Sequence, residues 1–89
     1  MQERNVTIVN RLGLHARAAA KFVSTAKAYS SVVKVGTATR KVDGKSIMSV
    51  MLLAASQGTE LVLSIDGDDE LPAMEALIAL IDDRFGEGE

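Results

Sequence analysis

A histidine and an arginine two residues apart are the side chains best suited to chemistry in this chain. His15 is the only histidine among 89 residues, and it follows Gly13 and precedes an alanine-rich run in the segment LGLHARAAAKF. Neutral imidazole has a free lone pair near pH 7 and can therefore accept a phosphoryl group and release it. The Arg17 guanidinium would neutralise the phosphoryl oxygens. The pair predicts phosphoryl transfer through His15.

The apolar pattern after His15 places this histidine at the start of a helix, which we expect from Ala16 to Ala28. The apolar residues recur at helical spacing: Ala16, Ala19, Ala20, Phe22, Val23, Ala26 and Tyr29. The first N–H groups of a helix lack partners and carry the positive end of its dipole. Those of Ala16 and Arg17 would stabilise a phosphoryl group on His15. Lys21 and Ser24 share the polar face with Arg17, so we expect them to contact partners.

Two other interpretations of His15 compete with phosphoryl transfer, and the sequence argues against both. A single histidine near a helix start is most often a surface residue without chemistry. Histidine is not a preferred capping residue, however, and Gly13 permits a close turn that would leave the ring accessible. The second interpretation is a hydrolase with His15 as its base, but no second catalytic group can be located near His15 from the sequence.

A second segment, Ser46 to Ala55, predicts a short helix with an exposed apolar patch. Ser46 follows an Asp-Gly turn and is a good N-cap. Val50 and Leu53 share one arc of the helix and are expected in the core. The other arc carries Ile47, Met48 and Met51, which we expect to form an exposed docking surface. The alternative is that the whole helix is buried and that Ser46 is only a cap.

The remaining segments indicate an α+β fold. Strands are expected over residues 5–10, 32–35, 39–42 and 60–65, and Gly58 is expected to end the second helix. A third helix, capped by Asp68 or Asp69, would bury a periodic apolar set: Leu71, Met74, Ile78, Ile81 and Phe85. Residues 87–89 would be a frayed tail. The mixed order of elements favours one antiparallel sheet with helices on one face.

The amino-acid composition excludes several classes of protein and of site. The chain has 47% apolar and 25% charged residues, as expected for a single domain over residues 1–89. It has no cysteine and one histidine, so we expect no disulfide and no metal site. No apolar run approaches the roughly 20 residues of a membrane span, so we expect no membrane insertion. The segment MQERNVTIVN lacks a signal-peptide core, so we expect a cytoplasmic location.

Charge is distributed unevenly along the chain. Residues 1–45 contain nine Lys or Arg and two Asp or Glu, whereas residues 46–89 contain one and ten. A basic surface around His15 would attract acidic partners or phosphate. The alternative is that the two halves intermix in the fold. The three aromatic residues, Phe22, Tyr29 and Phe85, are too few and too scattered for base stacking, so we expect no nucleic-acid binding.

The segments LGLHARAAAKFV and KSIMSVM resemble the active-site and regulatory-serine segments of HPr, the histidine phosphocarrier of the bacterial phosphoenolpyruvate-dependent phosphotransferase system (PTS). The two segments stand at the family's separation, and the resemblance covers nearly the whole chain. It implies an open-faced β-sandwich, a four-stranded antiparallel sheet covered on one face by three helices (βαββαβα). The family usually has proline where this chain has Ala18; this departure bears on local rigidity more than on chemistry.

The resemblance also implies the function. His15 would accept a phosphoryl group on Nδ1 from enzyme I of the PTS and pass it to IIA domains, and an HPr kinase/phosphorylase would modify Ser46. We therefore predict a monomeric phosphocarrier without cofactor, which is a covalent intermediate and not an enzyme in its own right. The alternative is a regulatory binding module, or a nitrogen-type PTS relay, that acts through the apolar helix patch and is not dedicated to sugar uptake.

Overall fold

The computed structural model describes residues 1–88. Its strands are β1 (Gln2–Thr7), β2 (Val32–Gly36), β3 (Lys41–Asp43) and β4 (Glu60–Asp66). Its helices are α1 (Ala16–Lys27), α2 (Ile47–Leu52) and α3 (Glu70–Asp82), followed by the 3₁₀ turn η1 (Arg84–Gly86). The order of elements is the predicted βαββαβα.

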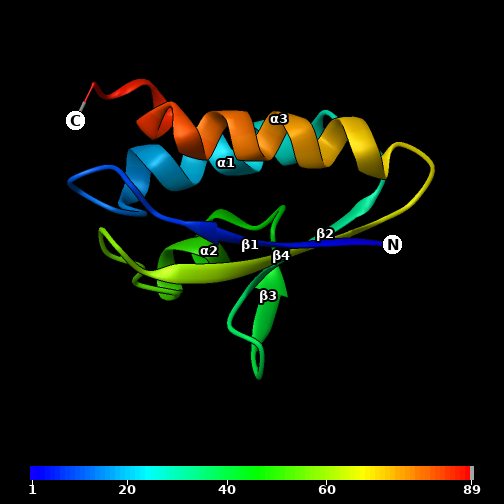
Figure 1. Cartoon of the computed structure of the whole chain (residues 1–89), viewed down its shortest axis with the longest axis horizontal. Coiled ribbons are helices and arrows are strands. Elements are labelled where there is room, and N and C mark those ends of the chain that lie inside the picture. The colour runs from blue at the N-terminus through cyan, green and yellow to red at the C-terminus, as the bar shows by residue number, and fades with distance from the viewer. Residues whose placement is uncertain (89) are drawn as a thin grey trace.

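The four strands form one antiparallel sheet in the order β1-β4-β2-β3. The first and last strands are neighbours, with Val6 opposite Leu61, and β4 also pairs with β2, with Val33 opposite Ile65. Helices α1 and α3 lie side by side above the sheet (Figure 1), while α2 packs against α1 and β3. The fold is therefore the predicted α+β open-faced sandwich.

The core lies between the sheet and the helices. Alternate residues of β4, Leu61, Leu63 and Ile65, are buried beneath the helices. Both α1 and α3 contribute to the same cluster, with Phe22 of α1 and Leu77 of α3 fully buried or nearly so. Burial of such a side chain contributes about 1.5–3 kcal/mol. Ala18 and Ala19, in the first turn of α1, belong to the same cluster, so the start of this helix is packed against the core.

Two strands differ from the sequence prediction. β1 spans Gln2–Thr7, not residues 5–10, because it pairs with β4 from Gln2 opposite Ile65 to Thr7 opposite Glu60, where β4 begins. Ile8 lies beyond the strand but is buried, and its N–H donates to Thr59 O at 2.9 Å. β3 begins at Lys41, not at residue 39, because the Thr37 N–H donates to Arg40 O at 2.9 Å and closes a turn over residues 37–40.

The end of α2 also differs. The helix ends at Leu52, not Ala55, and the left-handed residue that follows it is Ala54 (φ 51°), not Gly58. Ala55 is buried, and its carbonyl accepts from the Leu14 N–H at 2.9 Å. The chain leaves the helix early because this contact with the loop before α1 requires a different direction.

In α3, the prediction for Leu71 was wrong: its side chain is 57% exposed, whereas Leu77 is fully buried. The helix ends at Asp82, and Phe85 reaches the core only through the 3₁₀ turn, with φ 53°. Asp69 is the N-cap residue but makes no capping bond. Its carboxylate instead accepts from Ser30 N at 2.8 Å and Ser31 N at 2.9 Å, which ties the start of α3 to the loop after α1.

In α1, Ala16 and Ala20 are exposed although the pattern placed them on the apolar face, while Ala18 is fully buried. None of the helices described is long and apolar enough to cross a membrane. Across residues 1–88 the structure has no group of three or more histidine, cysteine, aspartate or glutamate side chains that could hold a metal ion.

Candidate functional site

His15 is the N-cap residue of α1. Its backbone is extended (φ −72°, ψ 178°), and its Nδ1 accepts a hydrogen bond from the Arg17 N–H at 3.3 Å. Position 13 requires glycine. Gly13 has φ +68°, and an added Cβ would lie 2.4 Å from Ala55 O. Because Gly13 packs this closely against Ala55, the loop before α1 is held in a position that places the His15 ring at the start of the helix. The His15 side chain is 28% exposed and therefore accessible to a partner.

A carboxylate lies on the other side of the His15 ring. Nε2 contacts Oε2 of Glu87, whose side chain is only 8% exposed. The other oxygen, Oε1, accepts from the Asn10 side-chain amide at 2.9 Å, and the same amide donates to Gly13 O at 2.8 Å. The pKa of Glu87 is lowered, chiefly by the hydrogen bond from Asn10 and then by the contact with His15 and the charge of Arg17. This carboxylate is therefore ionised near pH 7.

The two ring nitrogens of His15 thus have different roles. Because Nδ1 accepts from a backbone N–H, the proton of the neutral ring is on Nε2, where it is donated to Glu87. The lone pair of Nδ1 faces the positive end of α1, where the first N–H groups have no partners within the helix. The arrangement presents a nucleophile beside a site that favours an anion.

Neither Asn10 nor Glu87 was identified from the sequence. The segment after Gly86 was predicted to be a frayed tail, but Glu87 is held against His15 from 72 residues away; Glu89 lies outside the described residues. Figure 1 shows the segment that follows α3 beside the loop that precedes α1. No local pattern indicates this contact, because it depends on how α3 packs against α1.

The other predicted site residues on α1 fall into two groups. Ala16, Arg17 and Ser24 are exposed, and Ala16 and Arg17 lie in the first turn beside His15. Lys21 instead points its ammonium to the C-terminal turn, where Nζ donates to Phe85 O at 2.6 Å. Arg17 is therefore available to a partner or an anion, whereas Lys21 is engaged in holding the end of the chain.

The second predicted segment has the expected geometry. Ser46 caps α2, and its Oγ accepts from the Ser49 N–H at 3.3 Å. Ile47, Met48 and Met51 are 43%, 66% and 36% exposed, whereas Val50 is fully buried. The predicted exposure is confirmed. Two leucines that the prediction omitted are also exposed, Leu12 at 61% and Leu52 at 75%.

The α2 segment adjoins the His15 loop, because the Leu14 N–H bonds to the carbonyl of Ala55 just beyond the helix. We define the apolar patch as Ile47, Met48, Met51 and Leu52, which are exposed residues of one short helix. A partner that covers the apolar patch could therefore also reach the histidine.

The fold and the site define a class of protein: a small α+β chain with an open antiparallel sheet and an accessible histidine at a helix N-terminus. A family model described as "PTS HPr component phosphorylation site" matches residues 2–83. Phosphocarrier protein HPr of Cupriavidus necator is 55% identical over the full length of both chains, and that of Pseudomonas putida is 54% identical over the full length of both. The chain belongs to the HPr family of PTS phosphocarriers.

Solved structures agree with this assignment. The crystal structure of HPr-C-His from Thermoanaerobacter tengcongensis has a TM-score of 0.93 and 49% identity, with 98% of each chain covered. The structure of an HPr dimer from the same organism has a TM-score of 0.77, with 98% of this chain covered and 100% of that one. The open-faced fold predicted from the sequence is confirmed by these likenesses.

Proposed function

We propose that His15 accepts a phosphoryl group from phosphorylated enzyme I and donates it to IIA domains. The observation that carries the proposal is the orientation of the ring, with the Nδ1 lone pair toward the start of α1 and the proton on Nε2. In the first step the lone pair forms a bond to phosphorus, and the donor's bond to phosphorus breaks with its electron pair. The second step is the reverse, with a IIA nucleophile as acceptor.

In this proposal the first turn of α1 balances the phosphoryl charge. The N–H groups of Ala16 and Arg17 lie at the positive end of the helix, and the Arg17 N–H already points at Nδ1. Once Nδ1 is phosphorylated, this N–H can donate to a phosphoryl oxygen instead. The exposed Arg17 guanidinium adds two parallel donors and a full positive charge.

The apolar patch would be the docking surface for enzyme I and for IIA domains, and the exposed Ser24 of α1 would also contact these partners. Phosphorylation of Ser46 by an HPr kinase/phosphorylase would regulate docking. The Ser46 hydroxyl lies one residue before Ile47, so a phosphate there would place about two negative charges beside the apolar patch. Such a charge would repel acidic partners and increase the cost of desolvating the patch. We also propose a cytoplasmic monomer.

The decisive experiment is incubation of the purified chain with enzyme I and phosphoenolpyruvate. We expect an acid-labile, base-stable phosphoprotein, and we expect His15→Ala to abolish the label with an unchanged circular dichroism spectrum. Persistent label in His15→Ala would refute the assignment. Absence of label in the wild type, with enzyme I binding retained, would instead favour a regulatory binding module.

A further inference from the structure

Two of the four residues in the apolar patch are methionines, and both are accessible to solvent. Met48 is 66% exposed and Met51 is 36% exposed. They are three residues apart in α2, so their side chains lie on the same side of the helix. Met74, in contrast, is 2% exposed and belongs to the core. The apolar patch therefore presents two thioether sulfur atoms on the surface where a partner would dock.

Exposed thioethers are the groups of this chain that react most readily with peroxides. The sequence contains no cysteine, so no thiol competes for the oxidant. The thioether sulfur attacks one oxygen of hydrogen peroxide, the O–O bond breaks, and the products are methionine sulfoxide and water. The sulfur loses two electrons and the peroxide gains them. Because the reaction requires contact with the oxidant in solution, its rate at each methionine should follow the exposure of that residue.

We propose that Met48 and Met51 form an oxidation-sensitive site that regulates docking to enzyme I. Peroxide converts the two side chains to sulfoxides and weakens docking. Methionine sulfoxide reductases restore it, with a dithiol as reductant and with the thioether, a disulfide and water as products. This inference rests on the proposed function, because it assigns a regulation to the proposed docking surface.

The change in polarity is the reason that oxidation would weaken docking. Methionine is flexible and apolar, and it packs well against different partners. The sulfoxide oxygen is a polar acceptor, and docking against an apolar surface would remove it from water. Ile47 and Leu52 belong to the same patch, and neither side chain can donate a hydrogen bond to the new oxygen. Because a sulfoxide carries no net charge, the loss of affinity should depend little on salt.

Oxidation at these two positions should leave the fold and the histidine intact. Val50 is the buried residue of α2, and it attaches the helix to the core without a sulfur atom. The His15 loop is held by the Leu14 N–H, which donates to Ala55 O at 2.9 Å, and the His15 ring accepts from the Arg17 N–H. Neither contact involves a methionine, so oxidation should act on docking and not on the chemistry at His15.

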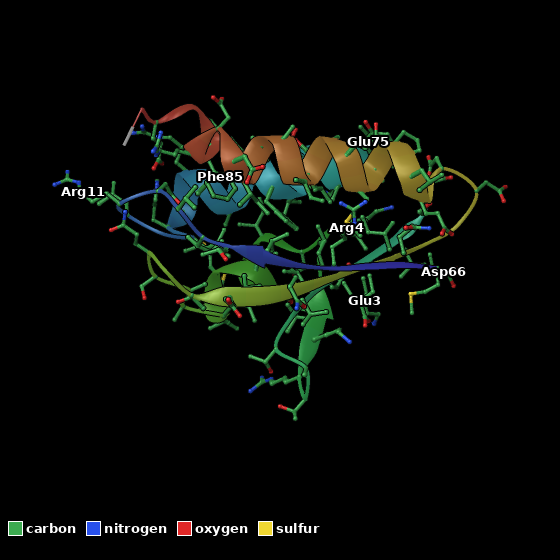
Figure 2. All side chains as sticks on the ribbon, viewed as in Figure 1. Glu3, Arg4, Arg11, Asp66, Glu75 and Phe85 are labelled. Atoms are coloured by element: carbon green, nitrogen blue, oxygen red, sulfur yellow. The ribbon has the colours of Figure 1, made fainter. Side chains whose placement is uncertain are left out.

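Met1 provides a control within the same chain. It is 71% exposed, and its ammonium lies 3.5 Å from Asp66 Oδ1. Figure 2 shows Asp66 at the end of the sheet where the chain begins, away from α2 (Figure 1). Met1 should therefore react with peroxide as readily as Met48 without affecting docking.

The first measurement is the order in which the methionines react. The purified chain is treated with hydrogen peroxide, and each methionine is followed by peptide mass spectrometry. We expect sulfoxide to form first at Met1 and Met48 and more slowly at Met51. Met74 should react last, and the urea unfolding midpoint should stay unchanged until it does. Oxidation of Met74 as fast as Met48 would overturn the proposal, because the core would then be damaged together with the patch.

The second measurement is the affinity for enzyme I of the reduced chain, the oxidised chain, and the oxidised chain after treatment with methionine sulfoxide reductases. We expect oxidation to weaken binding about tenfold, because docking buries a polar group without a hydrogen-bond partner. The loss should be the same at low and high salt and should be reversed by the reductases. Phosphoramidate, which phosphorylates imidazole as ammonia leaves, should label His15 equally in the reduced and oxidised chains. Loss of this label on oxidation would place the effect at His15 and overturn the proposal.

The matched variant combines Met48→Leu with Met51→Leu, which keeps the patch apolar but removes both sulfur atoms. After peroxide treatment this double variant carries sulfoxide at Met1 only, and it should bind enzyme I as tightly as before treatment. Equal affinities of the reduced and oxidised wild type, or an equal loss in the double variant, would overturn the proposal and leave the proposed function intact. Absence of binding by the reduced wild type would refute the proposed docking and this inference together.

Discussion

Replacing Met48 with aspartate should separate docking from folding. The Met48 side chain is 66% exposed, so about a third of its surface is buried. Full burial of a methionine contributes about 1.5–3 kcal/mol, so the substitution removes about 0.5–1 kcal/mol. Met48 is also in the first turn of α2, which has no acidic residue, and a carboxylate near a helix N-terminus contributes about 0.3–1 kcal/mol. The two effects nearly cancel, and the free energy of unfolding should change by less than about 1.5 kcal/mol.

Binding to enzyme I should respond differently, because docking would bury the new carboxylate in an apolar contact. The assay is the affinity of each variant for enzyme I across a salt series, alongside its urea unfolding curve. Ser46→Asp should also weaken binding, but its effect should shrink more as salt rises, since an exposed charge is screened beyond about 8–10 Å. The effect of Met48→Asp should shrink less, because it includes desolvation.

Val50→Ala is the matched control within the same helix. Val50 is fully buried, so loss of its two methyl groups should cost about 2 kcal/mol of stability while the folded variant keeps its affinity. Wild-type affinity in both Met48→Asp and Ser46→Asp would exclude α2 from the interface. A stability loss in Met48→Asp as large as that in Val50→Ala would show that Met48 acts as a core residue.

Three further predictions concern the loop and the helix starts. Arg17→Ala should slow phosphoryl transfer strongly in a rapid-quench assay without changing the unfolding curve, and Arg17→Lys should recover only part of the rate; equal rates would make the arginine a bystander. Gly13→Ala should cost at least about 2 kcal/mol in urea unfolding, because φ is +68° and its Cβ would meet Ala55 O at 2.4 Å; an unchanged midpoint would contradict this. Asp69 has a pKa of about 2, lowered chiefly by the Ser31 hydroxyl and then by the Ser30 N–H, from 3.8. The ionised Asp69 carboxylate therefore stabilises the fold above about pH 4, and this contribution to the free energy of unfolding is lost as pH falls through about 2. In Asp69→Asn the free energy of unfolding should vary less with pH between these values. A pH dependence identical to that of the wild type would refute this.

The sequence by itself determined the order of the elements and the position of His15. Helical spacing after Ala16 requires that His15 stand at a helix start, and alternation in β4 requires that Leu61, Leu63 and Ile65 face one side. The exposure of Met48 also followed from the helical period, since a six-residue helix in a small domain cannot bury every face. These features depend on residues that are close together in the chain, so the spacing of residue types in the sequence is enough to predict them.

Tertiary structure alone decided where elements end and what lies behind the histidine. α2 stops at Leu52 because Ala55 must meet Leu14, and Leu71 is exposed because α3 is rotated to bury Leu77. Glu87 and His15 are 72 residues apart in the chain, and no pattern of residue spacing in the sequence predicts that they pair. It exists because the core holds α3 beside α1, and the short turn through Phe85 then brings Glu87 to the His15 ring.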